Sequence, residues 1–242
     1  MTQRENYLDL IRSNIEDYGY HLYIVNSPTE PRYAYTIGLT QEIGFELIFA
    51  GGIFFMKKEV EKIIHLVAQD LIKTRDTNKI QVLNKSLGSF SLKSVDKSWS
   101  KLMMIGALDF YKTDKISSFQ LIPDASHYTL DIPDMSVSRG EAKDPVWEYL
   151  DKDWTLDVPH NSTITTNLDA LKGEPITEVT RWEENEWEMF AGSGNDVSEE
   201  EARVVPLGTL LGIDSTLYAS IKLSIGKGIW RDAEELIWHE WN

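Results

Sequence analysis

The chain has 242 residues, with 39 acidic against 24 basic side chains and a formal net charge of −15. Such an excess of acid repels polyphosphates, so nucleic acid is a poor candidate ligand. Cysteine is absent, which excludes disulfides, thiolate metal sites and cysteine nucleophiles. No stretch approaches the roughly 18 apolar residues of a membrane span, and the first residues lack a signal-peptide core, so we expect a cytoplasmic protein with no membrane partner.

The acidic residues are concentrated in the second part of the chain. Residues 1–150 hold 20 acidic and 17 basic side chains, whereas residues 151–242 hold 19 and 7. Six of the eight tryptophans also lie in the second stretch. The run 136–145, close to the boundary between these two stretches, is polar and rich in turn formers. We therefore expect two small domains, over residues 1–135 and 160–242, joined by a linker over 136–159.

Hydrophobic spacing predicts a mixture of helices and strands in the first domain. In chain order these are helix 3–18, strands 20–25, 33–39 and 46–52, helix 57–72, a hairpin over 80–95, helical residues 99–111, and strands 119–123 and 127–132. The helix over 57–72 is the clearest, because its apolar residues recur at every third or fourth position. This order indicates an α+β unit with a mixed sheet.

The second domain is predicted to follow the same logic on a smaller scale. Strands 176–181 and 187–190 flank a turn at 183–185, and a polar loop follows over 192–201. The apolar run 204–211 leads to Asp214, a suitable N-cap for a helix over 217–223. Residues 228–241 form a last strand or an irregular segment. The expected fold class is α+β, with two small domains that each pack a mixed or antiparallel sheet with helices.

Motifs for catalysis are missing from the sequence. The five histidines show no metal-binding spacing, and neither a phosphate-binding glycine loop nor a serine-nucleophile motif is present. We therefore expect no catalytic residue, no metal and no cofactor. His127 near Asp124 resembles a base with an orienting carboxylate, although a turn that bonds to itself would give the same pair.

Residues 183–188 form the densest acidic cluster. On a strand, Glu184, Glu186 and Glu188 would share one face, because side chains alternate between the two faces. Like charges at that spacing destabilise a strand unless a cation meets them. A bound metal, a basic partner or simple solvation would each answer this repulsion.

The segment AYTIGL at 34–39 is the most specific signal in the sequence. It is followed by FELI at 45–48, by Gly51 and Gly52, by residues 106–108 and by FQLIPD at 119–124. Together these resemble a bacterial domain-of-unknown-function family, number 4262, over residues 5–135. Phe45 stands where that family usually has proline, and the usual tryptophan before Pro123 is missing. A strand with one face of large residues also explains the segment, with Gly38 marking a close backbone approach.

Three strings in the second domain are similar to domains of polymorphic-toxin immunity proteins, over residues 160–242. They are ITEVTRWEENEWEMFAG at 176–192, VVPLGTLLGIDSTL at 204–217 and GKGIWRD at 226–232, with a late Trp238. The positions that carry the pattern are Leu207, Leu210, Leu211, Asp214, Ser215 and Leu217, then Gly226 or Gly228, and Arg231. The resemblance implies a protein that binds and neutralises a cognate bacterial toxin by occlusion.

An acidic surface with tryptophans suits a basic toxin, because charge steers the encounter and aromatic anchors slow dissociation. We expect the toxin-facing surface to contain Trp182, Glu184, Glu186, Trp187, Glu188, Asp196, Glu199 and Glu200. The alternative is that Trp187 packs inward and the glutamates only keep the domain soluble.

Two other functions stay open at this stage. One is a small-molecule-processing enzyme in the first domain, with His127, Asp124 and Tyr35 as its nearest candidate residues. The other is a protein-interaction adaptor without a toxin. The sequence leaves the oligomeric state open as well.

Overall fold

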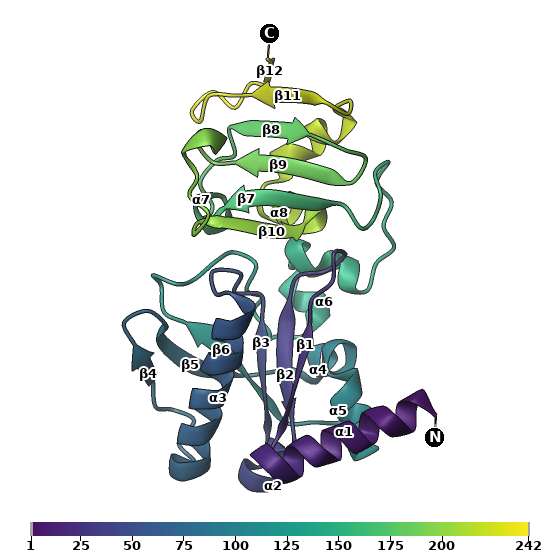
Figure 1. Ribbon diagram of the computed structural model, residues 1–242, viewed down its shortest axis with the longest axis vertical. Helices are drawn as coiled ribbons and strands as arrows, with labels where there is room; N and C mark the ends of the chain where they lie inside the picture. Colours follow the sequence, from purple (N-terminus) through teal and green to yellow (C-terminus); the bar gives the residue numbers. More distant parts are fainter. Residues whose placement is uncertain (1, 242) are drawn as a thin grey trace. The chain divides into compact units, whose positions relative to one another are not determined.

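The computed structural model describes residues 2–241 and divides into two compact units. Each unit contains one mixed six-stranded sheet together with helices (Figure 1). The predicted α+β fold with two sheet-containing regions is confirmed. None of the helices within residues 2–241 combines the length and the apolar character needed to cross a membrane.

The units divide at other residues than the sequence suggests. The first comprises the chain up to Val25, Arg32–Tyr128 and Asp134–Lys143, and the second comprises Asn26–Pro31, Thr129–Pro133 and the chain from Asp144 onward. The segment 136–159, expected as a linker, is thus shared between the two units. Trp147 anchors its second half, because this buried indole donates from Nε1 to the carbonyl of Asp131 at 2.8 Å. The segment around Trp147 is largely polar, so the sequence pattern did not indicate that this tryptophan is buried.

The first unit is built on β1 (His21–Val25), β2 (Tyr33–Ile37), β3 (Glu46–Ala50), β4 (Gln81–Asn84), β5 (Gly88–Ser94) and β6 (Ser118–Pro123). Their order is β1-β2-β3-β6-β5-β4, antiparallel except between β3 and β6. The helices are α1 (Gln3–Tyr18), α2 (Leu39–Ile43), α3 (Lys57–Thr74), α4 (Lys97–Met103), α5 (Ile105–Tyr111) and α6 (Arg139–Ala142). The strand predicted over 127–132 is wrong, because the amides of His127 and Ile132 close turns onto the carbonyls three residues earlier.

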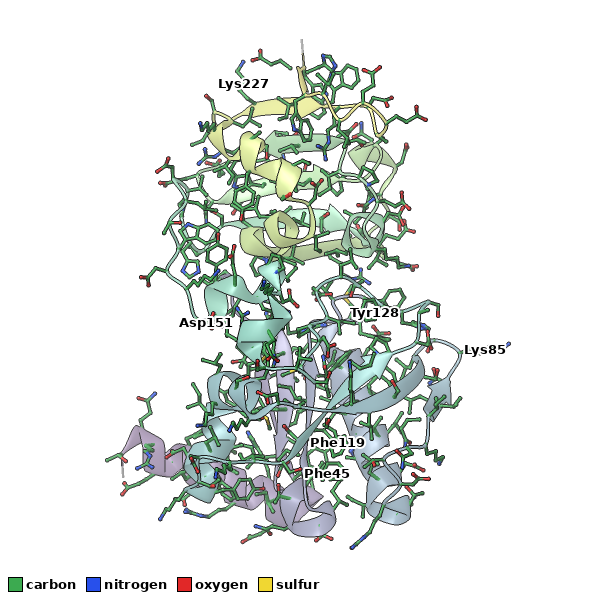
Figure 2. The ribbon with its side chains drawn as sticks, turned by 180° about the vertical axis from the view of Figure 1, so that it is seen from behind. Phe45, Lys85, Phe119, Tyr128, Asp151 and Lys227 are labelled. Atoms are coloured by element: carbon green, nitrogen blue, oxygen red, sulfur yellow. The ribbon has the colours of Figure 1, made fainter. Side chains whose placement is uncertain are left out.

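Helix α3 packs on one face of this sheet (Figure 1). Its buried residues are the apolar series that the sequence predicted, namely Val60, Ile63, Ile64, Val67, Ala68 and Leu71. They join Leu47 and Phe49 of β3 in the main core. Near the start of β3, Phe45 packs on Phe119 with ring centroids 4.7 Å apart (Figure 2), so the phenylalanine at the usual proline position is a core residue.

The opposite face of the first sheet carries a layer of tyrosines. Tyr35 of β2 is buried, and its hydroxyl accepts a hydrogen bond from the amide of Gly106 in α5 at 3.2 Å. The ring of Tyr23 lies 5.3 Å from that of Tyr35 and 5.9 Å from that of Tyr7 in α1. Burial and the neighbouring Tyr23 raise the pKa of Tyr7 to about 12. Burial also raises the pKa of Tyr35, so the Tyr7 and Tyr35 phenols are neutral at physiological pH and serve in packing.

A buried carboxylate explains much of the AYTIGL segment. Glu46 is fully buried and accepts hydrogen bonds from the hydroxyls of Thr36 and Tyr111, both at 2.6 Å. The amides of Gly38 and Thr40 donate to the same carboxylate at 3.0 and 2.9 Å. Gly38 has φ +122°, and a Cβ there would lie 3.1 Å from the backbone of a neighbouring turn, which confirms the predicted close approach. A buried charge needs such a set of donors, so the segment stabilises the fold.

The second unit is built on β7 (Thr163–Asn167), β8 (Glu178–Arg181), β9 (Glu186–Phe190), β10 (Ala202–Pro206), β11 (Lys227–Trp230) and β12 (His239–Glu240). Their order is β10-β7-β9-β8-β11-β12, antiparallel except between β7 and β9. The helices are η1 (Pro145–Leu150), α7 (Leu168–Lys172), η2 (Gly194–Asp196), α8 (Leu207–Ile213) and η3 (Ser215–Lys222), where η marks a 3₁₀ helix. The two strands predicted around the turn at 183–185 are confirmed as β8 and β9. Asp214 caps η3, because its side chain accepts from the amide of Thr216 at 2.9 Å.

Helical segments cover only one face of the second sheet. In Figure 1, α8 lies behind the strands, and in Figure 2, seen from the other side, it lies in front of them. The buried residues Val179 and Met189 belong to the covered face, together with Leu207 and Leu210 of α8. We call the other face, on which β7, β9, β8 and β11 lie uncovered in Figure 1, the open face.

Candidate protein-binding site

The open face of the second unit presents three cross-strand pairs from β8, β9 and the turn between them. The pairs are Glu178 with Phe190, Thr180 with Glu188, and Trp182 with Glu186. Residues directly opposite one another in a sheet share a face. Carboxylates, aromatic rings and one hydroxyl therefore lie side by side across these two strands.

Alternation along β9 sets this arrangement. Glu186 and Glu188 point to the open face, and the alternate residues Trp187 and Met189 are buried in the core. The guanidinium of Arg181 holds the connecting turn, because Nη2 donates to the carbonyl of Glu184 at 2.9 Å. The same guanidinium lies 4.8 Å from the centre of the Trp187 ring. The turn is thus fixed from the core side.

Strand β11 and the last described residues extend the open face beyond β8. Trp230 lies opposite Glu178, and Gly228 lies opposite Thr180. The ring of Trp241 covers Gly228 so closely that a Cβ on this glycine would come within 2.3 Å of it. Trp182, Trp230 and Trp241 are 53 %, 42 % and 47 % exposed. Such a group of exposed indoles is unusual for a surface without a binding role.

Two adjoining hollows lie among these tryptophans. One has a volume of about 410 Å³ and is bordered by Trp230, Trp241, Arg231 and the backbone near Gly192. The other has a volume of about 370 Å³ and is lined by Glu178, Thr180, Trp182, Glu188, Phe190, Gly194, Asn195 and Trp241. Glu178 and Trp241 border both. We call the second one the Trp182–Trp241 hollow.

The carboxylates at this surface have no cationic partner among the described residues. Glu178 accepts a hydrogen bond from the amide of Gly194 at 2.9 Å. Glu186 and Glu188 make neither a side-chain hydrogen bond nor an ion pair within residues 2–241. The nearest guanidinium on β8, that of Arg181, belongs to the covered face. These carboxylates therefore favour the binding of a positively charged group at this surface.

The loop after β9 carries the other acidic residues expected at the surface. Its start is fixed by Asn167, whose Nδ2 donates to the carbonyl of Ala191 at 2.8 Å. Asp196, Glu199 and Glu200 are exposed along this loop. None of the three lines either hollow, so their predicted role in binding a partner stays a prediction.

Two of the predicted site residues are placed differently. Trp187 is 1 % exposed and packs in the core, as the alternative expects for this residue, whereas the solely solubilising role that the alternative gives to the glutamates stays a prediction. Glu184 lies in the turn rather than on β9, so only Glu186 and Glu188 of the expected ladder share the strand face. Trp182 and Glu188 line the Trp182–Trp241 hollow.

Three residues of the site were missed by sequence reasoning: Glu178, Trp230 and Trp241. Alternation back from Trp182 through Thr180 points to Glu178, and this signal was present in the sequence. Trp230 and Trp241 depend on how β11 pairs with β8 across more than 40 intervening residues, which no local pattern determines.

The immunity-like positions Asp214 and Arg231 form an ion pair at 2.7 Å, in which the arginine is buried and the aspartate is partly buried. Arg231 also donates to the hydroxyl of Thr216 at 2.7 Å and to the carbonyl of Ile176. Its guanidinium lies 4.3 Å from the centre of the Trp238 ring. These contacts join η3, the segment before β8 and the chain after β11, so the two positions stabilise the fold that presents the open face.

In the first unit, Asp124 and His127 form a closely bonded turn. His127 Nδ1 lies 2.7 Å from Asp124 Oδ1, and the imidazole stacks on the ring of Phe55. The amide of Ser89 donates to the other carboxylate oxygen at 2.7 Å. Burial raises the pKa of this carboxyl, but hydrogen bonds from Ser126, His127 and Ser89 outweigh burial and hold the pKa well below its usual range.

Tyr35, the third residue of the enzyme alternative, lies on the other face of the first sheet. It is opposite Ile48 in β3, whereas the next residue, Phe49, points to the α3 face. Phe49 contacts Phe55, on which His127 stacks. The sheet therefore separates Tyr35 from His127, and the three residues do not form one site. Across residues 2–241, no group of three or more acidic or histidine side chains is arranged to hold a metal ion.

Two of the residues bonded to Glu46, Thr36 and Gly38, belong to the AYTIGL segment that carried the first resemblance. Residues 14–128 match the family described as Domain of unknown function (DUF4262). The resemblance is thus confirmed for this DUF4262 region, which lies within the expected residues 5–135. No curated protein and no solved structure matches the chain. The open face lies outside the DUF4262 region, so the immunity-like pattern of the second unit stays a prediction.

Proposed function

We propose that this chain is an immunity protein, which binds a cognate bacterial toxin through the open face and neutralises it by occlusion. The observation that carries the proposal is the set of unpaired carboxylates among three exposed tryptophans on an uncovered sheet face. Binding needs a preorganised complementary surface and no reacting group. The resemblance to immunity proteins that the sequence strings within residues 160–242 suggest points to the same function.

The chemistry of the face favours a basic partner. Tryptophan is enriched among the residues that contribute most to protein–protein binding, because its large rigid ring loses little entropy when it is covered. Glu186 and Glu188 without counter-charges attract cations over several ångströms. Residues 151–242, with 19 acidic and 7 basic side chains, add a long-range field of the same sign.

Survival of cells tests this function. The full chain is co-expressed with a candidate toxin chosen from the genes beside its own, and colonies are counted with and without induction. We expect the chain to restore growth, and the toxin to be recovered at full length in complex with it, because occlusion leaves the toxin intact. Cells that die equally with and without the chain would contradict the proposal.

The same assay separates the adaptor alternative. An adaptor would bind a protein partner through this face without changing survival. Stable binding with no rescue therefore favours the adaptor over the immunity protein.

A further inference from the structure

The Trp182–Trp241 hollow has a floor formed by one row across the sheet. Gly228 of β11, Thr180 of β8 and Glu188 of β9 lie opposite one another in that order. Trp241 covers the Gly228 end, and Trp182 lines the hollow on the β8 side. Two indoles thus border a floor that contains a hydroxyl and a carboxylate.

The polar groups on this floor lack partners. Thr180 is 7 % exposed overall, but its hydroxyl makes no hydrogen bond within the described chain and is not among the oxygens buried from solvent. This hydroxyl is therefore accessible from the hollow that Thr180 lines. Glu188, beside it, has no cation within the part of the chain that the structure describes. Both groups are suited to a ligand that donates hydrogen bonds and carries positive charge.

A guanidinium satisfies all of these groups together. It is planar, always charged, and presents five N–H donors, so it stacks on indole rings while donating to a carboxylate. The unit already uses this pairing internally, since Arg231 lies over Trp238 at 4.3 Å and Arg181 over Trp187 at 4.8 Å. A lysine ammonium is more strongly hydrated and stacks less well.

We propose that the Trp182–Trp241 hollow binds the side chain of one arginine on the surface of a protein partner. The guanidinium stacks on Trp182 and Trp241 and donates to the Glu188 carboxylate and the Thr180 hydroxyl. The identity of the larger partner rests on the proposed function, whereas the chemistry of the hollow does not.

Small probes test the hollow in the full-length chain. N-acetyl-arginine amide is compared with the citrulline amide, which has the same shape without the charge, and with the lysine amide. Binding is followed by the indole N–H resonances of Trp182 and Trp241 in the ¹⁵N-labelled protein. We expect a saturable shift of both resonances with arginine, a weaker one with lysine and none with citrulline.

Substitutions locate the binding. Glu188→Gln and Thr180→Val should each weaken arginine binding by about three- to tenfold, the range expected for partly exposed polar and charged contacts. Glu184→Gln removes a nearby charge that does not line the hollow and should leave binding unchanged. Thermal unfolding of each variant confirms that the fold is retained.

Three results would overturn the inference: equal binding of arginine and citrulline, tighter binding of lysine, or arginine binding that Glu188→Gln leaves unchanged. Failure of the inference is distinguishable from failure of the proposed function. The probes report only on the hollow, and cell survival reports only on neutralisation, so a chain that protects cells without preferring arginine keeps the function and loses the inference.

Discussion

Arg231 connects three segments of the second unit through bonds to Asp214, Thr216 and Ile176. Its side chain is 1 % exposed. Replacing Arg231 with methionine leaves Asp214 partly buried without its counter-charge, and breaking such a pair costs about 3–5 kcal/mol. We expect a loss of that size in the free energy of unfolding, measured by urea denaturation.

Lys93→Met is the matched control for this change. It removes one partner of the exposed Lys93–Asp134 ion pair, and exposed pairs contribute less than about 1 kcal/mol. Equal losses in the free energy of unfolding for Arg231→Met and Lys93→Met would show that the Asp214–Arg231 pair contributes no more to stability than an exposed ion pair.

Asp124 makes stability depend on pH in the acidic range. Its folded pKa lies below the ordinary carboxyl value of 3.8, so its contribution is complete above that value and is lost as the pH falls below it. Asp124→Asn should therefore destabilise the chain by about 1–2 kcal/mol near neutral pH, with a deficit that shrinks below about pH 4. Denaturant melts at several pH values measure this. Asp114→Asn, at an exposed loop position, is the control, and a deficit independent of pH for Asp124→Asn would refute the linkage.

Residue types alone predicted part of the site. Trp182, Glu186 and Glu188 were identified because they alternate along a strand-like pattern, and the structure places all three on the open face. The same alternation points the ring of Trp187 inward, as the alternative for this residue expects, and Trp187 is buried. The Asp214–Arg231 pair was visible only as two motif positions, since the ion pair requires the fold.

At the scale of elements, the position of the Trp241 ring depends on its close packing against Gly228. The backbone of Gly228 is compatible with alanine, but a Cβ would collide with the Trp241 ring. Gly228→Ala should therefore displace Trp241 and weaken binding of the arginine probe by about threefold or more, with little change in the melting temperature. The indole resonance of Trp241 and a probe titration measure the two effects.

Gly140→Ala provides the comparison, because a Cβ there meets open space. It should leave both the Trp241 resonance and probe binding as in the parent chain. An unmoved Trp241 in Gly228→Ala would show that the ring does not depend on the missing Cβ.

Element prediction succeeded where one face is strongly apolar and failed where turns bond locally. The six apolar residues of α3 were predicted correctly, because a regular stripe must face a core. Residues 127–132 alternate like a strand, yet the amides of His127 and Ile132 donate to the carbonyls of Asp124 and Thr129 and form turns instead. The pairing of β8 with β11 joins distant segments, so no local pattern reveals it.

For the whole molecule, the acidic excess predicts how a partner associates. The open face and the surrounding acid should steer a basic toxin, so the association rate should fall as salt rises. Reversing two charges with Glu186→Lys and Glu188→Lys should slow association by about tenfold and flatten the salt dependence. Stopped-flow or surface plasmon resonance measurements give both quantities.

The control for charge reversal is Glu16→Lys with Asp17→Lys, which makes the same change in net charge on exposed residues of α1. This variant should associate at nearly the parent rate. Equal slowing by both pairs would mean that total charge, rather than the open face, controls the encounter.

A hydrogen-exchange footprint of the complex tests most directly whether the toxin binds the open face. The chain is compared alone and with its toxin, and deuterium uptake is followed peptide by peptide. We predict slower exchange over residues 178–190 and 227–241 on binding, with α3 unchanged. Protection confined to residues 14–128, with none at β8, β9 or β11, would contradict the account.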